Sequence, residues 1–455
     1  MIFRIIVMFL CIIISFNFLS NGYVLSKTTE QCVSSYQPGM LKDLIVFPQS
    51  LKVYSDLLGE ITLISGKKLE EKYNFFRKRF FQPWYSKGPT FPVHDAYIIF
   101  SYPNTKSHAT WWAENLLPWT EKNWKAVEKN AARSTYPSCN YTGIITERTA
   151  VRAAPTVSPF FRNPSLAGEG FPFDYLMEAN IHLGTPVLVT HISEDEAWVF
   201  IETPFVSGWV RDNVVAKVNS DIIKQFLSLP QASIIYDGVL LKDASGVHGG
   251  AGFLGTVLPM VKLTGDTAML LVPVRDQYGN AHIITAETPK HNVLPMPQVL
   301  TPKLLASIGE SLIGQPYGWG GLFGRRDCSE MISDLFIPFG VWLPRNSQQQ
   351  VHERHFINLE HVSKEKFYSV MKTQAIPFVT LIGFQGHVGL YLGMYNDTPV
   401  MLHDLWGVHT IDNGHKGRYI LGRVIISSLD LGNELCNLNK DETLFSRLEG
   451  ISILN

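Results

Sequence analysis

Apolar and polar positions change their spacing several times along the chain, and each change indicates a different kind of element. Residues 69–84 (LEEKYNFFRKRFFQPW) combine charges with aromatic pairs in a helical rhythm and end near Pro83, which cannot continue a helix. A second helical stretch spans Trp119–Ala132. This spacing predicts a helical N-terminal domain over residues 37–142.

Two later segments alternate apolar and polar residues with the period of two that indicates strands. The first covers residues 143–218, and we expect its Trp198 to lie in a barrel core. The second covers residues 230–290 and folds back at the turn Asp276–Gly279. Each has the length of a small β-barrel, although no residue-by-residue repeat relates the two. A proline-rich linker follows and marks a domain boundary.

The last predicted domain covers residues 300–430 and begins with a helix. Apolar residues recur at helical spacing from Met331 to Phe339, so a second helix begins at Cys328, directly after a glycine-rich loop. Residues 431–455 form a C-terminal tail to which the sequence assigns no role. The chain is therefore predicted to be an α+β multidomain protein.

The first 22 residues have the pattern of a signal peptide. Arg4 supplies a positive charge, and Ile5–Leu19 is almost wholly apolar. This run is shorter than the roughly 20 residues that a membrane span needs. An uncleaved anchor is the alternative. We expect an exported protein, periplasmic or extracellular, with no membrane contact once the signal is removed.

Composition excludes several classes of protein. The 39 basic and 40 acidic residues give a net charge of −1, which argues against nucleic acid as a partner. The apolar content of 45% can fill several cores, so the chain is not disordered. Five cysteines are too few for a disulfide framework, although a bond among Cys32, Cys139 and Cys436 is possible. Their spacing suits no zinc site, and we expect neither a metal nor a cofactor.

Cys328 is the candidate nucleophile. The start of a helix carries partial positive charge and free N–H groups, and both favour the reactive thiolate. Its neighbours Asp327 and Ser329 are polar, which is unusual for a cysteine that only fills a core. An inert buried cysteine is the alternative.

Two histidines on a predicted hairpin are the candidate partners of the thiol. His387 precedes the alternating run Val388, Leu390 and Leu392, and a loop centred on Tyr395 would place it directly opposite His403. At a pair spacing of roughly 5 Å the two imidazoles can form a hydrogen bond. The second would then orient the first, as the third member of a catalytic triad does.

Four motifs together resemble the NlpC family of cell-wall cysteine peptidases, which are papain-like hydrolases of peptidoglycan stem peptides. They are PYGWGG at 316–321, RDCS at 326–329, GHVGLYLG at 386–393 and LHD at 402–404. The resemblance implies that Cys328 is the nucleophile, His387 the general base and His403 the residue that orients it. It also implies that Tyr317 helps to stabilise the oxyanion and that Trp319, Asp327 and Ser329 bind substrate.

The order of a helical region, two bacterial SH3 domains and a C-terminal peptidase is similar to a multidomain subgroup of that family. In this subgroup the first SH3 domain narrows the cleft and favours stem peptides with a free N-terminal L-alanine, which are cut after γ-D-glutamate. The resemblance makes Glu178 the candidate carboxylate for that ammonium group.

Two other functions agree with the same motifs. The chain would be a cell-wall-binding protein if its SH3 modules alone were active, or an amidase or acyltransferase of the wider papain-like group. The sequence leaves open the third residue of the stem peptide and whether the substrate is intact wall or released fragments. It also leaves open whose wall is cut and the oligomeric state.

Overall fold

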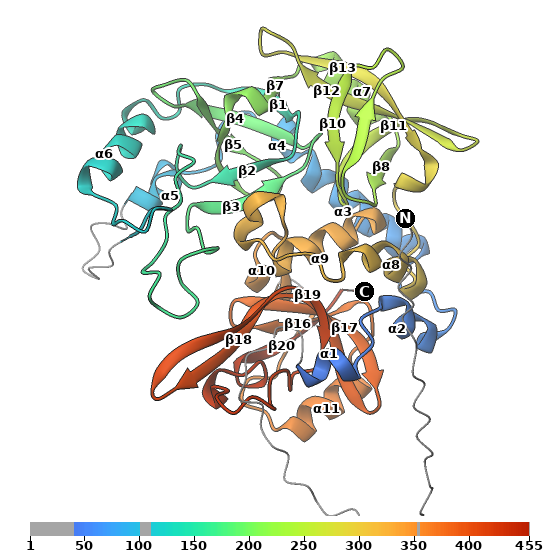
Figure 1. The fold of residues 1–455 in the computed structure, drawn as a ribbon. Helices are drawn as coiled ribbons and strands as arrows, with labels where there is room; N and C mark the ends of the chain where they lie inside the picture. The colour runs from blue at the N-terminus through green and yellow to red at the C-terminus, as the bar shows by residue number, and fades with distance from the viewer. Residues whose placement is uncertain (1–40, 101–110, 353–354, 455) are drawn as a thin grey trace, which may run out of the picture.

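The computed structural model describes residues 41–100, 111–352 and 355–454 (Figure 1). The predicted signal segment and Cys32 lie outside these residues. Among the described residues, no helix has the length and apolar character needed to cross a membrane. Cys436 forms a disulfide, whereas Cys139 and Cys328 are free thiols, so Cys139 is no longer a candidate for the bond.

The N-terminal region is helical, as predicted, but its described residues form no separate core. Its helices are α1 (Lys42–Val46), α2 (Leu51–Leu58), α3 (Gly66–Phe80), α4 (Gln82–Tyr85), α5 (Val93–Ala96) and α6 (Glu121–Asn130). Leu51 and Tyr54 pack into the core of the C-terminal domain. Phe76 and Trp84 pack between the two β-domains and that domain, and Trp124 packs on the first β-domain. The region therefore binds the other domains together by dividing its apolar faces among them.

The first β-domain has seven strands. They are β1 (Tyr141–Ile145), β2 (Thr149–Arg152), β3 (Met177–Ile181), β4 (Pro186–Ile192), β5 (Trp198–Glu202), β6 (Ser207–Arg211) and β7 (Val215–Lys217). Their order in the sheet is β3-β2-β6-β5-β4-β1-β7. Trp198 is buried, as expected, but it lies in the cluster shared with the N-terminal helices and not with the valines and isoleucines of the barrel interior.

The second β-domain repeats this strand order. It follows α7 (Ser220–Ser228) and consists of β8 (Gln231–Ile234), β9 (Val239–Lys242), β10 (His248–Gly252), β11 (Val257–Thr264), β12 (Thr267–Arg275), β13 (Ala281–Pro289) and β14 (Val293–Pro295). The order β10-β9-β13-β12-β11-β8-β14 is that of the first sheet with every label raised by seven. The two domains thus share one topology, although their sequences show no repeat.

The C-terminal domain places helices on a six-stranded antiparallel sheet. Its helices are α8 (Pro302–Gly309), α9 (Cys328–Phe336), α10 (Ser347–His352) and α11 (Lys364–Thr373). Its strands are β15 (His355–Asn358), β16 (Thr380–Phe384), β17 (His387–Tyr395), β18 (Thr398–Asp412), β19 (His415–Ser427) and β20 (Leu448–Ile453), in the order β15-β20-β16-β17-β18-β19.

The prediction that residues 431–455 form a tail outside the C-terminal domain is wrong. Strand β20 lies between β15 and β16, and it pairs with both. Ile451 is fully buried. The last residues therefore complete the sheet, because β16 would otherwise present an unpaired edge.

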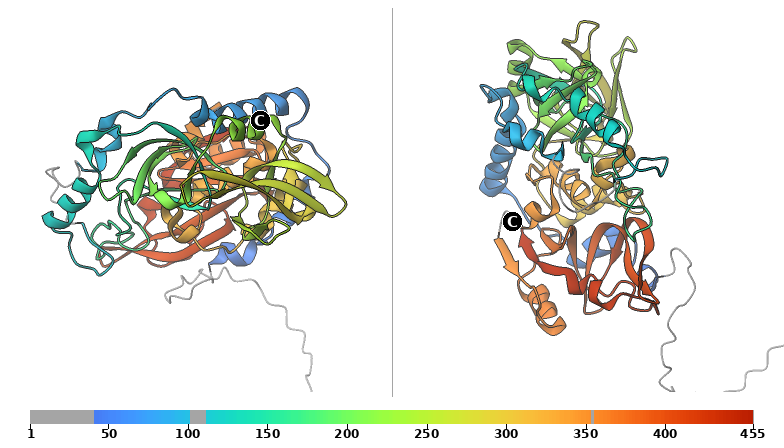
Figure 2. Two further views of the ribbon diagram at one scale, coloured as in Figure 1. Left: turned by 90° about the horizontal axis from the view of Figure 1, so that it is seen from above. Right: turned by 90° about the vertical axis from the view of Figure 1, so that its left-hand side faces the viewer.

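Short 3₁₀ helices connect the larger elements. They are η2 (Arg133–Thr135), η3 (Asp212–Val214), η4 (Lys290–Asn292), η5 (Glu310–Leu312), η6 (Trp319–Gly324), η7 (Ile337–Phe339), η8 (Lys440–Glu442) and η9 (Phe445–Arg447). Figures 1 and 2 show the layer of α8, α9 and α10 between the two β-domains on one side and the C-terminal sheet on the other. Helix α9, which begins at Cys328, is thus central to the molecule.

Candidate active site

Cys328 is the first residue of α9, as the apolar spacing predicts. The preceding Asp327 caps the helix, because its carboxylate accepts a hydrogen bond from the backbone N–H of Glu330 at 2.9 Å. The thiol is 6% exposed and lines a cavity of about 390 Å³. The backbone N–H of Val388, at the start of β17, donates to its sulfur. Cys328 and the strand of His387 therefore meet directly.

The charge state of Cys328 differs from the expected thiolate. Burial raises the pKa of the thiol, and the adjacent Asp327 carboxylate raises it further. The partial charge of the helix terminus is outweighed, because a buried anion loses most of its hydration. Cys328 is consequently a neutral thiol, and to act as a nucleophile it would need a base to remove its proton.

His387 and His403 form the predicted pair, but diagonally and not directly opposite one another. Leu390 pairs with Leu402, so the register places Gly389 opposite His403. The difference arises at the turn, which consists of Asn396 and Asp397, both at positive φ as in a type I′ hairpin, and at a bulge after Tyr391.

The two imidazoles nevertheless meet. His387 Nε2 lies 2.9 Å from His403 Nδ1. Burial lowers the pKa of His403 to about 3. Burial is also the main cause that lowers the pKa of His387 well below its ordinary value, and the nearby Arg447 charge acts in the same direction. Both rings are therefore neutral near pH 7.

A serine fixes which nitrogens carry protons. The hydroxyl of Ser427 donates to the carbonyl of Ser428 at 2.9 Å, so its oxygen accepts from His403 Nε2, also at 2.9 Å. His403 Nδ1 is then the acceptor for the Nε2–H of His387. This chain of bonds leaves His387 Nδ1 with a lone pair, which is what a general base requires.

The remaining predicted residues line the same cavity as Cys328. They are Tyr317, Trp319, Asp327, Ser329 and Glu178. Burial raises the pKa of Tyr317 well above its ordinary value, and the neighbouring Cys328 adds to the shift. Tyr317 thus keeps its proton and can donate a hydrogen bond.

Trp319 is held by aromatic residues of the first β-domain. Its ring lies 5.1 Å from that of Phe173 and 5.9 Å from that of Tyr175. Met177 and Phe205 of the same domain also line the cavity. The first β-domain therefore forms one wall of the cleft, as the resemblance implied.

Arg345 also lines this cavity, although no sequence motif points to it. Its guanidinium donates to Asp327 at 2.7 Å and 3.0 Å and to Ser329 at 2.8 Å. Burial acts to raise the pKa of Asp327, but the Arg345 charge and these hydrogen bonds lower it on balance. Arg345 follows a run of apolar residues in a loop, and no sequence motif indicates that it contacts Asp327 at the start of α9.

Glu178 differs from Asp327 because it has no hydrogen bond or ion pair with any described residue. Its side chain is exposed within the cleft. Desolvation by the surrounding walls raises the pKa of its carboxyl, and Arg345 partly opposes this rise. The first β-domain thus presents an unpaired carboxylate to the cavity of Cys328.

Three family models match the chain. Residues 9–136 match the N-terminal stabilising domain of NlpC/P60 proteins, and residues 159–211 match an SH3 domain of the SH3b1 type. Residues 314–424, which contain Cys328, His387 and His403, match the NlpC/P60 family itself.

The protein is a multidomain NlpC/P60 cysteine peptidase. The NlpC/P60 match confirms the expected family, and the stabilising-domain match agrees with N-terminal helices that pack on every other domain. Peptidoglycan is accordingly the substrate class of this peptidase.

A solved structure shares this fold. An NlpC/P60 endopeptidase from Photobacterium damselae subsp. piscicida superposes with a TM-score of 0.80 at 24% identity, over 90% of this chain and 97% of that chain. An NlpC/P60 family protein from Bacillus cereus gives a TM-score of 0.45 at 17% identity, over 69% and 99% of the respective chains, which is too low to support an argument. No curated protein sequence matches the peptidase.

Proposed function

We propose that this peptidase cleaves peptidoglycan stem peptides between γ-D-glutamate and the diamino acid, and that it prefers peptides with a free N-terminal L-alanine. The observation that carries the proposal is the unpaired Glu178 carboxylate in the cavity of Cys328. An ammonium group beside Glu178 would restore an interaction to a carboxylate that has lost much of its hydration. An acetylated N-terminus has no such charge.

The proposed reaction begins with the neutral thiol. His387 Nδ1 takes the proton of Cys328 as the sulfur attacks the carbonyl carbon of the γ-glutamyl amide. The oxyanion of the tetrahedral intermediate accepts hydrogen bonds from the Tyr317 hydroxyl and the backbone N–H of Cys328. The C–N bond then breaks, and His387 returns the proton to the leaving amine.

Hydrolysis of the thioester completes the cycle. A water molecule gives a proton to His387 Nδ1 and attacks the same carbonyl carbon. The C–S bond breaks, the thiol recovers its proton, and the γ-D-glutamate carboxylate is released. In these steps His403 takes no proton from the substrate or the thiol; it only orients His387.

The roles of Asp327 and Ser329 are more indirect than the resemblance implies. Both already bond to Arg345, so we propose that they set the position of Arg345 and the charge of the cavity. Trp319 supplies an apolar wall for the substrate. We propose further that the chain is exported and that residues 1–22 are its signal.

A digest followed by mass spectrometry tests the proposal. The purified chain is incubated separately with L-Ala-γ-D-Glu-diaminopimelate and with the same peptide N-acetylated. The Cys328→Ala variant is incubated with both peptides in parallel. If only the unsubstituted chain releases L-Ala-γ-D-Glu, and only from the peptide with a free N-terminus, both the cleavage site and the N-terminal preference are supported. Cleavage of both peptides would remove the role of Glu178, and cleavage by Cys328→Ala would remove that of the thiol.

A further inference from the structure

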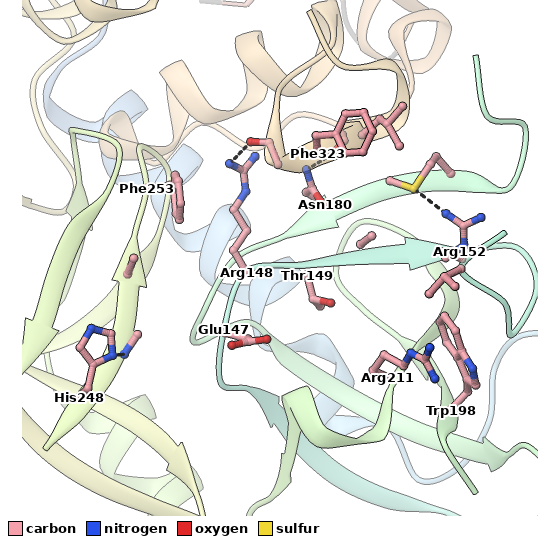
Figure 3. Close-up of a pocket in the computed structure, with 18 residues that line it drawn as sticks. Glu147, Arg148, Thr149, Arg152, Asn180, Trp198, Arg211, His248, Phe253 and Phe323 are labelled. Carbon is pink, nitrogen blue, oxygen red and sulfur yellow. Dashed lines mark hydrogen bonds between the residues drawn. The ribbon is translucent and has the colours of Figure 1, made fainter. Parts of the chain in front are cut away.

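A second and larger cavity, of about 650 Å³, lies where the two β-domains meet the η6 loop (Figure 3). Its walls come from β2 and β3 of the first domain, β10 of the second domain and the end of η6. Met177 lines both this cavity and the cleft of Cys328. Asn180 donates a hydrogen bond to the Gly321 carbonyl in the wall between them. A volume of this size suits a ligand of a few residues.

Two opposite charges line this cavity without pairing. Arg211 and Glu147 have no hydrogen bond or ion pair with each other or with any other described residue. Both side chains are exposed. The Arg211 guanidinium lies 4.2 Å from the ring centroid of Trp198, and its charge helps to lower the pKa of the exposed Asp195 carboxyl without forming an ion pair with it.

The other two arginines of the cavity provide the contrast. Arg148 pairs with Glu330 at 2.6 Å, and Arg152 pairs with Asp174 at 3.0 Å. Both pairs are buried, so these charges are neutralised within the protein. Arg211 and Glu147 are thus the cavity charges that form no ion pair with a described residue. A ligand with one anionic and one cationic group would give each of them an ion-pair partner.

The part of the cavity wall formed by η6 is apolar, and its backbone is strained. Phe323 of η6 is 77% exposed and has a φ of 56°, a left-handed conformation that is uncommon for a large side chain. Its ring lies 6.1 Å from that of Phe171 in the first β-domain. Phe253 of the second domain lines the cavity as well. Backbone strain of this kind is typical of ligand-binding segments, where the surrounding structure maintains it.

We propose that this cavity binds a zwitterionic peptide fragment, with a carboxylate on Arg211, an ammonium group on Glu147 and the intervening methylene groups against Phe323 and Phe253. This inference rests on the proposed function, because the diamino-acid end of a stem peptide has this chemistry. The fragment has two possible sources, an uncut stem peptide or the diamino acid released by cleavage.

Titration calorimetry on the full chain carrying Cys328→Ala tests the inference. The probes are L-Ala-γ-D-Glu-meso-diaminopimelate and meso-diaminopimelate alone. We expect the tripeptide to occupy two sites per chain, and Arg211→Ala or Glu147→Gln to weaken one of them at least about tenfold, or about 1.4 kcal/mol. Glu147→Gln keeps the shape of the side chain and serves if Arg211→Ala disturbs the packing of Trp198.

Arg133→Ala is the matched control, because Arg133 is also exposed and lies 5.6 Å from an aromatic ring centroid, that of Tyr97, outside the cavity. It should leave both sites unchanged. Binding of diaminopimelate that Arg211→Ala weakens would identify the released product as the occupant. Binding of the tripeptide alone would identify the uncut stem peptide.

A single site per chain, or two sites that ignore Arg211→Ala and Glu147→Gln, would overturn the inference. Turnover of the tripeptide by the unsubstituted chain is measured in parallel. Turnover with one site would leave the proposed function intact without the second cavity. Binding that depends on Arg211 without turnover would leave the second cavity intact without the proposed function.

Discussion

His403 Nε2 lies 2.9 Å from the hydroxyl oxygen of Ser427, and this contact sets the tautomers of both active-site histidines. The hydroxyl proton of Ser427 is already committed to the Ser428 carbonyl, so the serine can only accept from His403. The direction of the next bond follows, so His387 Nε2 donates to His403 Nδ1 and His387 Nδ1 keeps its lone pair. A residue on β19 thereby determines which nitrogen of His387 keeps its lone pair.

Ser427→Ala should reduce kcat roughly tenfold or more while KM changes little, because both imidazoles lose their enforced tautomer. It should also destabilise the fold by about 1–3 kcal/mol, since the buried His403 N–H loses its acceptor. Steady-state kinetics and urea unfolding measure the two effects. Ser307→Ala, which removes an exposed hydroxyl bonded within its own helix, is the control. An unchanged kcat for Ser427→Ala would contradict the tautomer argument.

The stability of the fold should fall as the pH is lowered below about 6.5, the ordinary pKa of histidine. His403 has a folded-state pKa of about 3, so the unfolded chain binds more protons between these two values. The stability contributed by the neutral ring is present above pH 6.5 and lost as the pH falls toward 3. Each pH unit in this window should remove up to about 1.4 kcal/mol for this histidine.

Urea midpoints at several pH values measure this dependence, and His403→Gln should flatten it. His387 should contribute in the same direction, because burial also lowers its pKa. A slope that is the same in the His403→Gln variant and the unsubstituted chain would assign the acid sensitivity to other groups.

Glu178→Gln should raise KM for the free tripeptide about tenfold and leave the N-acetylated peptide unaffected, because only the free peptide has an ammonium group to lose a partner. The measurement is kcat/KM for both peptides. Glu287→Gln, at an exposed position of the second β-domain, is the control. Equal losses for the two peptides would indicate that Glu178 has a structural role only.

Arg148→Ala should destabilise the protein by about 3–5 kcal/mol, because it leaves the Glu330 carboxylate buried without its closest partner. Arg345 remains, at 3.4 Å from Glu330. Glu330→Gln in the Arg148→Ala background should recover part of the loss, which a double-mutant cycle of unfolding free energies would measure. Lys129→Ala, which breaks an exposed pair with Glu194, should cost no more than about 1 kcal/mol. A small effect of Arg148→Ala would mean that this contact does not hold α9 against the first β-domain.

The sequence determined the parts of this protein that local spacing controls. Apolar residues at helical spacing placed Cys328 at the start of α9, and alternation placed both histidines on one hairpin. The positions of these residues on a helix or a hairpin depend on the side-chain period of the backbone and on turn residues, and both can be recognised in the sequence. The loop was expected around Tyr395, whereas the turn is Asn396–Asp397 and a bulge follows Tyr391. The expected pairing of the two histidines therefore differs from the observed register by two residues.

Only the tertiary structure decided what depends on segments far apart in the chain. The neutral state of Cys328 follows from its burial, Arg345 returns to Asp327 from a loop, and β20 inserts into the sheet from the predicted tail. The shared topology of the two β-domains was equally hidden, because strand order survives when side chains diverge. Burial, charge pairing and strand insertion are properties of three-dimensional neighbours, and no spacing along one chain specifies them.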